Sequence, residues 1–311
     1  MIALRSAIFQ NERMRRRRSV DKPRGNCYYI RMRKLRGKII AITGGSSGIG
    51  KHIAETFSVG NAVVDLSRSA ETSALFTDGG EAKNGLYHIK CDVSSETDVI
   101  AAFGMIKSAF GRVDLLINNA GYGVSGAVEL LKDEEVERIF EVNFMGVFRC
   151  CKYALPLMSE GAKIVNISSA CAIFPLPFRG MYCASKAAVS MLSHSLREEV
   201  KPYGIDVTAI CPGDIKTPFT RNRVKNFTTN ERYGSRIKDA DDHISARENK
   251  RMSVDYACRK IEKIILKRKY KPFYIVGGKY KALYALYRIF PLGAILGATG
   301  KMFAPKQKDK D

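Results

Sequence analysis

The sequence predicts an α/β fold in which a largely parallel sheet of about seven strands is covered by helices on both faces. From residue 38 onward, short apolar runs alternate with segments of helical periodicity. The runs are apolar throughout rather than alternately polar, as expected of strands buried on both faces of a sheet. The chain has 311 residues, 45% of them apolar, which is enough for one large domain of this doubly wound class.

The elements follow one another in a regular order along the chain. We expect strands over residues 39–43, 62–66, 86–91, 113–117, 163–168, 206–210 and 273–276. We expect helices over residues 49–58, 96–110, 134–158 and 181–201. Parallel strands joined by helices require crossover connections, which we expect to be right-handed.

Charge is concentrated at the two ends of the chain. Residues 1–36 hold 12 Lys and Arg against 2 acidic residues, and residues 247–311 hold 17 against 5. The intervening residues 37–246 hold 23 against 24, so the body is neutral. A neutral body argues against a specific nucleic-acid partner, because nucleic-acid enzymes usually carry basic charge around the working cleft. Basic ends fit either an anionic membrane surface or solvated tails.

The same composition shifts predict the domain organisation. We interpret residues 1–36 as a basic extension that is either disordered or precedes a true start at Met32. Residues 37–280 form the predicted catalytic domain, and residues 281–311 form an apolar and then basic tail. Residues 214–252 are polar, and a long polar excursion inside a compact domain predicts either a substrate lid or a disordered segment. The tail is interrupted by glycines and a proline, so it makes a poor transmembrane helix.

Cysteine and histidine usage indicates a reducing compartment and no metal site. The chain has eight cysteines without a Cys-x-x-Cys pair, and its four histidines are scattered. Free thiols favour a cytoplasmic protein, peripheral to a membrane if the basic ends bind one. The Arg-rich N-terminus lacks an apolar core and is not a secretory signal, whereas an organellar presequence stays open.

A glycine-rich turn joins the first strand to the first helix. It reads Thr43-Gly44-Gly45-Ser46-Ser47-Gly48-Ile49-Gly50. Glycines at such a turn let the backbone approach a pyrophosphate, and the following helix N-terminus supplies free N–H groups. The turn therefore predicts a Rossmann-type dinucleotide site.

The end of the second strand predicts which dinucleotide is bound. An acidic residue there accepts from the ribose 2′-hydroxyl, whereas an arginine pairs with a 2′-phosphate. Asp65 falls within the strand, which leaves Ser67 and Arg68 at its exit. We therefore predict NADP(H) as the cofactor. NAD(H) is the alternative if Asp65 accepts a hydrogen bond from the ribose 2′-hydroxyl.

Polar residues also follow later strands, at the sheet edge where ligands bind in open α/β folds. Asp92 and Val93 come after the third strand, where Asp92 could accept from the adenine amino group. Asn118-Asn119-Ala120-Gly121 closes the fourth strand, although Asn and Gly also favour plain turns.

A Tyr/Lys pair is the candidate catalytic centre. Tyr182 and Lys186 stand four residues apart on one helical face. A neighbouring ammonium favours the phenolate, so the pair can act as general acid and base. Ser169 ends the fifth strand thirteen residues earlier, and Asn143 lies mid-helix, an unusual place for Asn without a partner.

Together these motifs closely resemble those of the short-chain dehydrogenase/reductase superfamily, from residue 37 to residue 217 and more loosely to 278. The resemblance implies that Tyr182 exchanges the proton, Ser169 binds the substrate oxygen, and Lys186 lowers the Tyr182 pKa and holds the nicotinamide ribose. It also implies that Asn143 holds a water linking Lys186 to solvent. The predicted cofactor site, together with Tyr182 and Lys186, comprises Gly44, Ser46, Ser47, Gly48, Ile49, Gly50, Ser67, Arg68, Asp92, Val93, Asn119, Ala120, Gly121, Pro212, Gly213, Ile215 and Thr217.

The substrate is predicted from the apolar segment that follows Ser169. Residues 170–178 are strongly apolar, which core packing would also explain, but their two prolines predict a loop that lines the pocket. With the apolar tail, they suggest a retinoid, steroid or long-chain ketone, and residues 212–219 resemble the retinol and 17β-hydroxysteroid dehydrogenase branch. The alternatives are a silent binding or redox-sensing protein of this fold, or an NAD(H)-dependent alcohol dehydrogenase of a small substrate. The superfamily also implies a homodimer or homotetramer.

Overall fold

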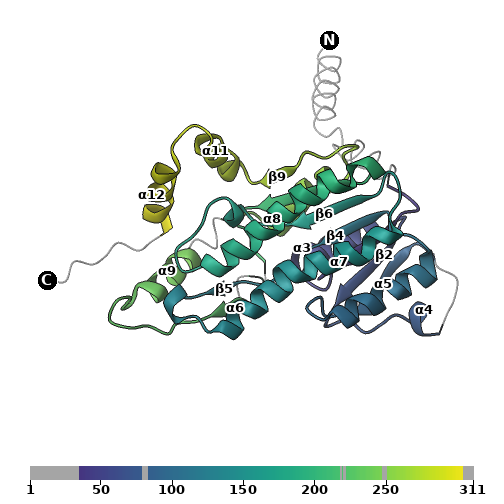
Figure 1. The fold of residues 1–311 in the computed structure, drawn as a ribbon, viewed down its shortest axis with the longest axis horizontal. Helices are drawn as coiled ribbons and strands as arrows, with labels where there is room; N and C mark the ends of the chain where they lie inside the picture. Colours follow the sequence, from purple (N-terminus) through teal and green to yellow (C-terminus); the bar gives the residue numbers. More distant parts are fainter. Residues whose placement is uncertain (1–34, 79–82, 218, 220–221, 247–250, 304–311) are drawn as a thin grey trace, which may run out of the picture. The chain divides into compact units, whose positions relative to one another are not determined.

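The fold is a seven-stranded parallel sheet between two layers of helices (Figure 1). The computed structural model describes residues 35–78, 83–217, 219, 222–246 and 251–303. The strands lie in the order β3-β2-β1-β4-β6-β7-β9. Their bounds are β1 Ile39–Thr43, β2 Ala62–Ser67, β3 Gly85–Lys90, β4 Leu115–Asn118, β6 Lys163–Ile167, β7 Asp206–Pro212 and β9 Phe273–Val276. This confirms the predicted α/β class and the number of strands in the sheet.

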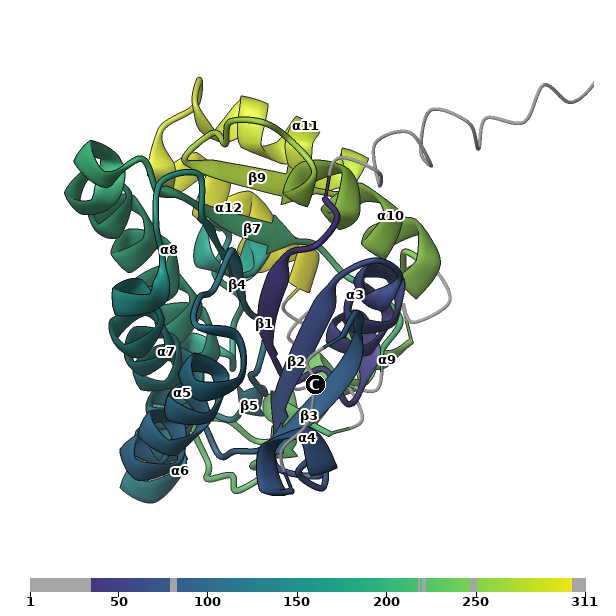
Figure 2. The same cartoon turned by 90° about the vertical axis from the view of Figure 1, so that its right-hand side faces the viewer.

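Helices cover the sheet on both faces, as its buried strands require (Figure 2). One face carries α3 (Gly48–Ser58) and α10 (Val254–Ile265), and the other carries α5 (Glu96–Phe110), α7 (Gly146–Ala154) and α8 (Gly180–Val200). A short helix α4 (Ala74–Thr77) precedes β3. The strand order reverses direction between β1 and β4, which creates the switch point where open α/β sheets bind ligands.

The helix predicted over residues 134–158 is present as one continuous helical segment, but a π-helical turn at Asn143 interrupts its α-helical geometry. Helix α6 (Asp133–Phe140) passes into a π-helical turn, Glu141–Met145, before α7 begins. A 3₁₀ turn, Leu155–Leu157, then ends the segment at its proline. The π turn follows from the Asn143 side chain, which is fully buried and bonded to a neighbouring loop rather than to solvent.

The polar segment after β7 contains a helix that the sequence did not reveal. Helix α9 (Arg236–Ser245) buries Ile237, Ala240, Asp241 and Ile244, which recur at helical spacing. The buried stripe includes an aspartate, so the apolar periodicity is weak in the sequence. A two-stranded parallel pair, β5 (Val124–Ser125) with β8 (Val224–Lys225), joins this segment to the residues after β4.

The C-terminal segment packs against the loop that follows β6. It forms α11 (Gly278–Tyr287) and α12 (Leu292–Phe303). Ile295 of α12 and four residues of α11 cluster with Ala170 and Phe174 of the loop. Within the part of the chain that the structure describes, no helix is long and apolar enough to cross a bilayer. The predictions for residues 1–34, including the start at Met32, and for the last residues 304–311 lie outside the described residues.

Candidate active site

A cavity of about 800 Å³ opens at the carboxyl ends of the parallel strands, beside the β1/β4 switch point. All of the predicted site residues line it except Gly50 and Asn143, which lie directly behind its wall. The cavity runs from the glycine turn and the end of β2 to Tyr182 and the start of α8. One continuous site therefore joins the predicted cofactor and catalytic residues.

The glycine turn brings backbone N–H groups to the cavity. Gly44 and Gly48 have φ values of +67° and +56°, which disfavour any side chain. A Cβ on Gly50 would lie 2.2 Å from the carbonyl oxygen of Gly44, so this close approach requires glycine. Helix α3 has no acidic residue in its first turn, and the Ser47 side chain does not cap it. Its N-terminus is thus suited to an anionic group such as a pyrophosphate.

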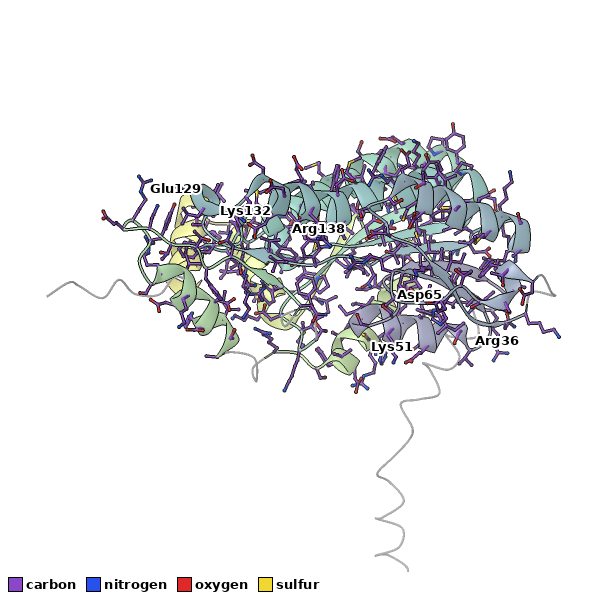
Figure 3. All side chains as sticks on the ribbon, turned by 90° about the horizontal axis from the view of Figure 1, so that it is seen from below. Arg36, Lys51, Asp65, Glu129, Lys132 and Arg138 are labelled. Atoms are coloured by element: carbon purple, nitrogen blue, oxygen red, sulfur yellow. The ribbon has the colours of Figure 1, made fainter. Side chains whose placement is uncertain are left out.

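Asp65 binds the backbone of the glycine turn and does not line the cavity. Its side chain is fully buried in β2, where Oδ1 accepts from the backbone N–H of Gly45 at 2.6 Å. Oδ2 accepts from the Ser67 hydroxyl at 2.9 Å and lies 3.2 Å from Nδ1 of His88. Figure 3 marks Asp65 beside the helix that carries Lys51. Both carboxylate oxygens are therefore engaged inside the protein.

Positive charge gathers where β2 leaves the sheet. The Arg68 side chain is 62% exposed, and its Nη1 lies 3.9 Å from Oδ2 of Asp92. Arg138, which the sequence analysis did not single out, also lines this part of the cavity. Burial raises the pKa of Asp92, but two hydrogen bonds from Ser94 and the charges of both arginines outweigh it and lower that pKa. This end of the cavity therefore holds two guanidinium groups and one ionised carboxylate.

The residues after β4 tie the turn to the sheet. The Asn119 side chain donates to the carbonyl oxygens of Thr43 and Gly44, each at 3.1 Å. The Thr43 hydroxyl accepts from the backbone N–H groups of Asn119 and Ala120. Asn119 thus holds the turn in place, which goes beyond the plain turn role that its sequence context allowed.

Tyr182, Ser169 and Lys186 meet at the other end of the cavity. Tyr182 and Lys186 are buried on the first turns of α8, and Ser169 follows β6. Burial raises the pKa of the Tyr182 phenol, although a hydrogen bond with Ser169 opposes this. Burial also lowers the pKa of Lys186 to about 8, and its Nζ donates to the carbonyl oxygen of Ile167 at 2.9 Å. The net shift of the Tyr182 pKa is upward because desolvation of the phenol dominates, and the expected lowering of that pKa by Lys186 stays a prediction.

Asn143 does not line the cavity but binds the loop that forms its wall. Its Oδ1 accepts from the backbone N–H of Tyr122, and its Nδ2 donates to the Tyr122 carbonyl and to the Ser185 hydroxyl. A Cβ on Gly121 would lie 2.9 Å from Asn143 Oδ1 and 3.3 Å from Lys186 Nζ. Asn143 therefore fixes the loop that separates it from Lys186, while its predicted water stays a prediction.

Sequence reasoning missed several residues that line the cavity near Tyr182. Three are arginines, Arg179, Arg223 and Arg251, and a fourth is Tyr280 of α11. The position of Arg179, three residues before Tyr182, could have indicated it. The others come from distant segments, and no motif connects them to the site.

Comparisons with known proteins agree with this geometry. A family model described as short chain dehydrogenase matches residues 38–227. The chain is 41% identical over 192 residues to a 3-ketodihydrosphingosine reductase of Bacteroides thetaiotaomicron, covering 61% of this chain and 68% of that protein. It is 33% identical over 259 residues to a probable short-chain type dehydrogenase/reductase of Helicobacter pylori, covering 80% of this chain and 92% of that protein.

Solved structures show the same architecture. A short-chain dehydrogenase from Streptomyces avermitilis superposes with a TM-score of 0.69 at 27% identity, over 86% of this chain and 97% of that one. A 3-ketoacyl-(acyl-carrier-protein) reductase from Brucella melitensis, complexed with NADH, gives 0.63 at 28% identity, over 79% of this chain and 99% of that one. Sequence, fold and site thus agree that this chain belongs to the short-chain dehydrogenase family, whose members are NAD(P)-dependent oxidoreductases.

Proposed function

We propose that this enzyme reduces a ketone or aldehyde with NADPH, and that Tyr182 supplies the proton. The observation that carries the proposal is the single cavity, which joins the uncapped N-terminus of α3 to Tyr182, Ser169 and Lys186. A dinucleotide lying along it would place its phosphates at the glycine turn and its reactive ring beside Tyr182.

The chain's own residues provide the proton chemistry. When bound, NADPH supplies a hydride to the carbonyl carbon of the substrate. The hydroxyl of Ser169 donates to the carbonyl oxygen, and the phenol of Tyr182 transfers its proton to that oxygen, which completes the alcohol. A buried phenol with a raised pKa stays protonated at neutral pH, which suits an acid in the reductive direction. Lys186 lies one turn along α8 and, when charged, stabilises the phenolate left behind.

The preference for NADP(H) is supported by the residues at the end of β2. Asp65 has both oxygens engaged, so it is a poor acceptor for a ribose hydroxyl. Arg68 and Arg138 face the cavity and could pair with a 2′-phosphate. Initial rates with NADPH and NADH test this preference. Equal or better use of NADH would support the rival, an NAD(H)-dependent alcohol dehydrogenase.

An apolar, lipid-like carbonyl compound is the proposed substrate class. Phe219, Cys171 and Ile244 line the cavity near Tyr182, and the Phe219 and Tyr182 ring centroids lie 5.7 Å apart. Relatives include the 3-ketodihydrosphingosine reductase and a 3beta-hydroxysteroid dehydrogenase of Mediterraneibacter gnavus, 35% identical over 196 residues.

A carbonyl panel with NADPH, run beside Tyr182→Phe, tests catalysis. We expect Tyr182→Phe to lower kcat by about 10²- to 10⁴-fold, because it removes the general acid. Tyr203→Phe is the matched control, since Tyr203 is exposed and does not line the cavity. Turnover that survives Tyr182→Phe would overturn the mechanism, and turnover confined to small polar sugars would overturn the substrate class. Absence of turnover across the panel, with intact cofactor binding, would favour a silent binding protein.

We also propose that the C-terminal segment binds an anionic membrane surface. Ile289 and Phe290, between α11 and α12, are 75% and 51% exposed, and Leu292 at the start of α12 is 54% exposed. Lys281 and Arg288 lie exposed on the same segment, a combination typical of interfacial elements. Vesicles containing phosphatidylglycerol should therefore sediment the protein, and vesicles of phosphatidylcholine alone should not.

The double change Ile289→Ser with Phe290→Ser should abolish that sedimentation, whereas Val59→Ser, at an exposed apolar position on another face, should not. Sedimentation unaffected by the double change would refute the membrane role.

A homodimer or homotetramer through α7 and α8 stays a prediction. It is supported by the exposure of Phe148 and Met191, at 40% and 67%, and light scattering after gel filtration would test it.

A further inference from the structure

Three arginines line the cavity, in the same space as the apolar side chains of Phe219, Cys171 and Ile244. Arg179 precedes α8, Arg223 precedes β8, and Arg251 follows α9. They come from three separate segments and converge on one space. Guanidinium groups are costly to bring together beside an apolar pocket unless an anion neutralises them.

Arg179 is the most telling of the three. It is half-buried, and its Nη2 is completely buried yet has no hydrogen-bond partner. It lies close enough to Tyr182 for its charge to lower the pKa of that phenol, against the larger effect of burial. A buried donor without a partner is destabilising, and a bound anion would supply the acceptor that it lacks.

Arg223 supplies a second cation beside the reacting residues. It is 7% exposed, its Cγ would lie 3.2 Å from a Cβ on Gly123, and Phe219 lies at the same place. Burial, together with the charges of Arg179 and Arg251, lowers the pKa of Arg223 to about 10. The three guanidinium groups therefore repel one another across the cavity.

Two carboxylates partly offset this charge. Asp241 accepts from Arg223 Nη1 at 2.7 Å, but Lys225 Nζ lies 2.8 Å from its second oxygen. Asp214 also lines the cavity, where it accepts from the Tyr280 hydroxyl at 2.6 Å. Arg179 has no carboxylate within ion-pair distance among the described residues, and Asp241 is shared between Arg223 and Lys225, so positive charge is in excess beside Arg179 and Arg223.

We infer that the carbonyl substrate is an amphiphile with an anionic group, a carboxylate, phosphate or sulfonate, that docks between Arg179 and Arg223. The carbonyl lies at Tyr182 and the apolar part lies against Phe219, Cys171 and Ile244. Arginine suits this role because its planar fork pairs with such oxyanions through two hydrogen bonds. The inference rests on the proposed reductase function and specifies its substrate class.

Three ketones of equal chain length test the inference: a medium-chain keto carboxylate, its methyl ester and the corresponding keto amine. With NADPH, we expect kcat/KM to be about 10- to 100-fold higher for the carboxylate than for the ester. This is the range expected when a charged carboxylate gains hydrogen bonds from an arginine that the ester cannot form. The amine should be the poorest of the three. Turnover of all three at equal efficiency would overturn the inference and leave the reductase function intact, whereas no turnover of any would refute the reductase function itself.

The residue assignment is tested by Arg179→Gln, which should reduce the carboxylate-to-ester ratio by about 10-fold or more. Arg232→Gln is the matched control, because Arg232 is 73% exposed on the same segment as Arg223 and lies outside the cavity. Binding of decanoate, measured by calorimetry without turnover, should weaken in Arg179→Gln and not in Arg232→Gln. If Arg179→Gln instead raises the KM for NADPH and leaves the ratio unchanged, Arg179 binds the cofactor and the inference is wrong.

Discussion

Replacing Arg68 by alanine should convert a preference for NADPH into indifference between the two cofactors. Two unit charges 4 Å apart attract by about 4 kcal/mol at the effective dielectric of a protein surface. The Arg68 side chain is 62% exposed, however, and shares its charge with Asp92 at 3.9 Å. Solvent screening therefore reduces the lost interaction to about 1–2 kcal/mol. This corresponds to an increase in the KM for NADPH of about 5- to 30-fold.

The assay is initial-rate kinetics with NADPH and NADH varied separately at a saturating carbonyl substrate. The KM for NADH should change little, because that cofactor lacks the 2′-phosphate. Arg259→Ala is a suitable control, since Arg259 is an exposed arginine on α10 outside the cavity. Equal increases for both cofactors would show that Arg68 contacts a part they share. An unchanged KM for NADPH would refute the assignment of Arg68 to the phosphate.

Three further outcomes follow from buried contacts. Burial lowers the pKa of Lys186 from 10.5 to about 8, so between these pH values the unfolded chain binds more protons than the folded chain. The free energy of unfolding should therefore rise with pH across this window, by on the order of 3 kcal/mol relative to Lys186→Met. Asp241→Asn leaves a buried guanidinium without its carboxylate and should lower the free energy of unfolding in urea by about 3 kcal/mol, whereas the exposed Asp242→Asn should not. In Gly213→Ala the new Cβ would lie 2.1 Å from the Tyr280 ring, so urea should show a loss of about 1–3 kcal/mol and proteases should cleave the C-terminal segment faster.

Much of the fold could be predicted because its strands are continuously apolar and short. The structure places β1 and β9 at the predicted residues and moves the other strand ends by one or two positions. The predicted cofactor residues gather in one cavity because the carboxyl ends of parallel strands share one edge of the sheet. Where the topology is regular, a local sequence motif is sufficient to predict where its residues lie in the fold.

The parts that could not be predicted depend on contacts between distant segments. The π turn at Asn143 exists because its side chain bonds to Tyr122, twenty-one residues earlier. Helix α9 was hidden because its buried face includes Asp241, whose partner Arg223 stands eighteen residues away. The direction of the Tyr182 pKa also depends on burial, which a Tyr/Lys spacing does not specify.

The contact between Gly213 and Tyr280 has a consequence for how this enzyme can vary. Because Tyr280 of α11 packs against Gly213, just after β7, and against the loop after Ser169, α11 forms part of the wall of the active site. Substitutions there can reshape the chamber around a substrate without disturbing any strand of the sheet. Substitutions in α11 can therefore change substrate specificity among relatives that keep the same catalytic residues.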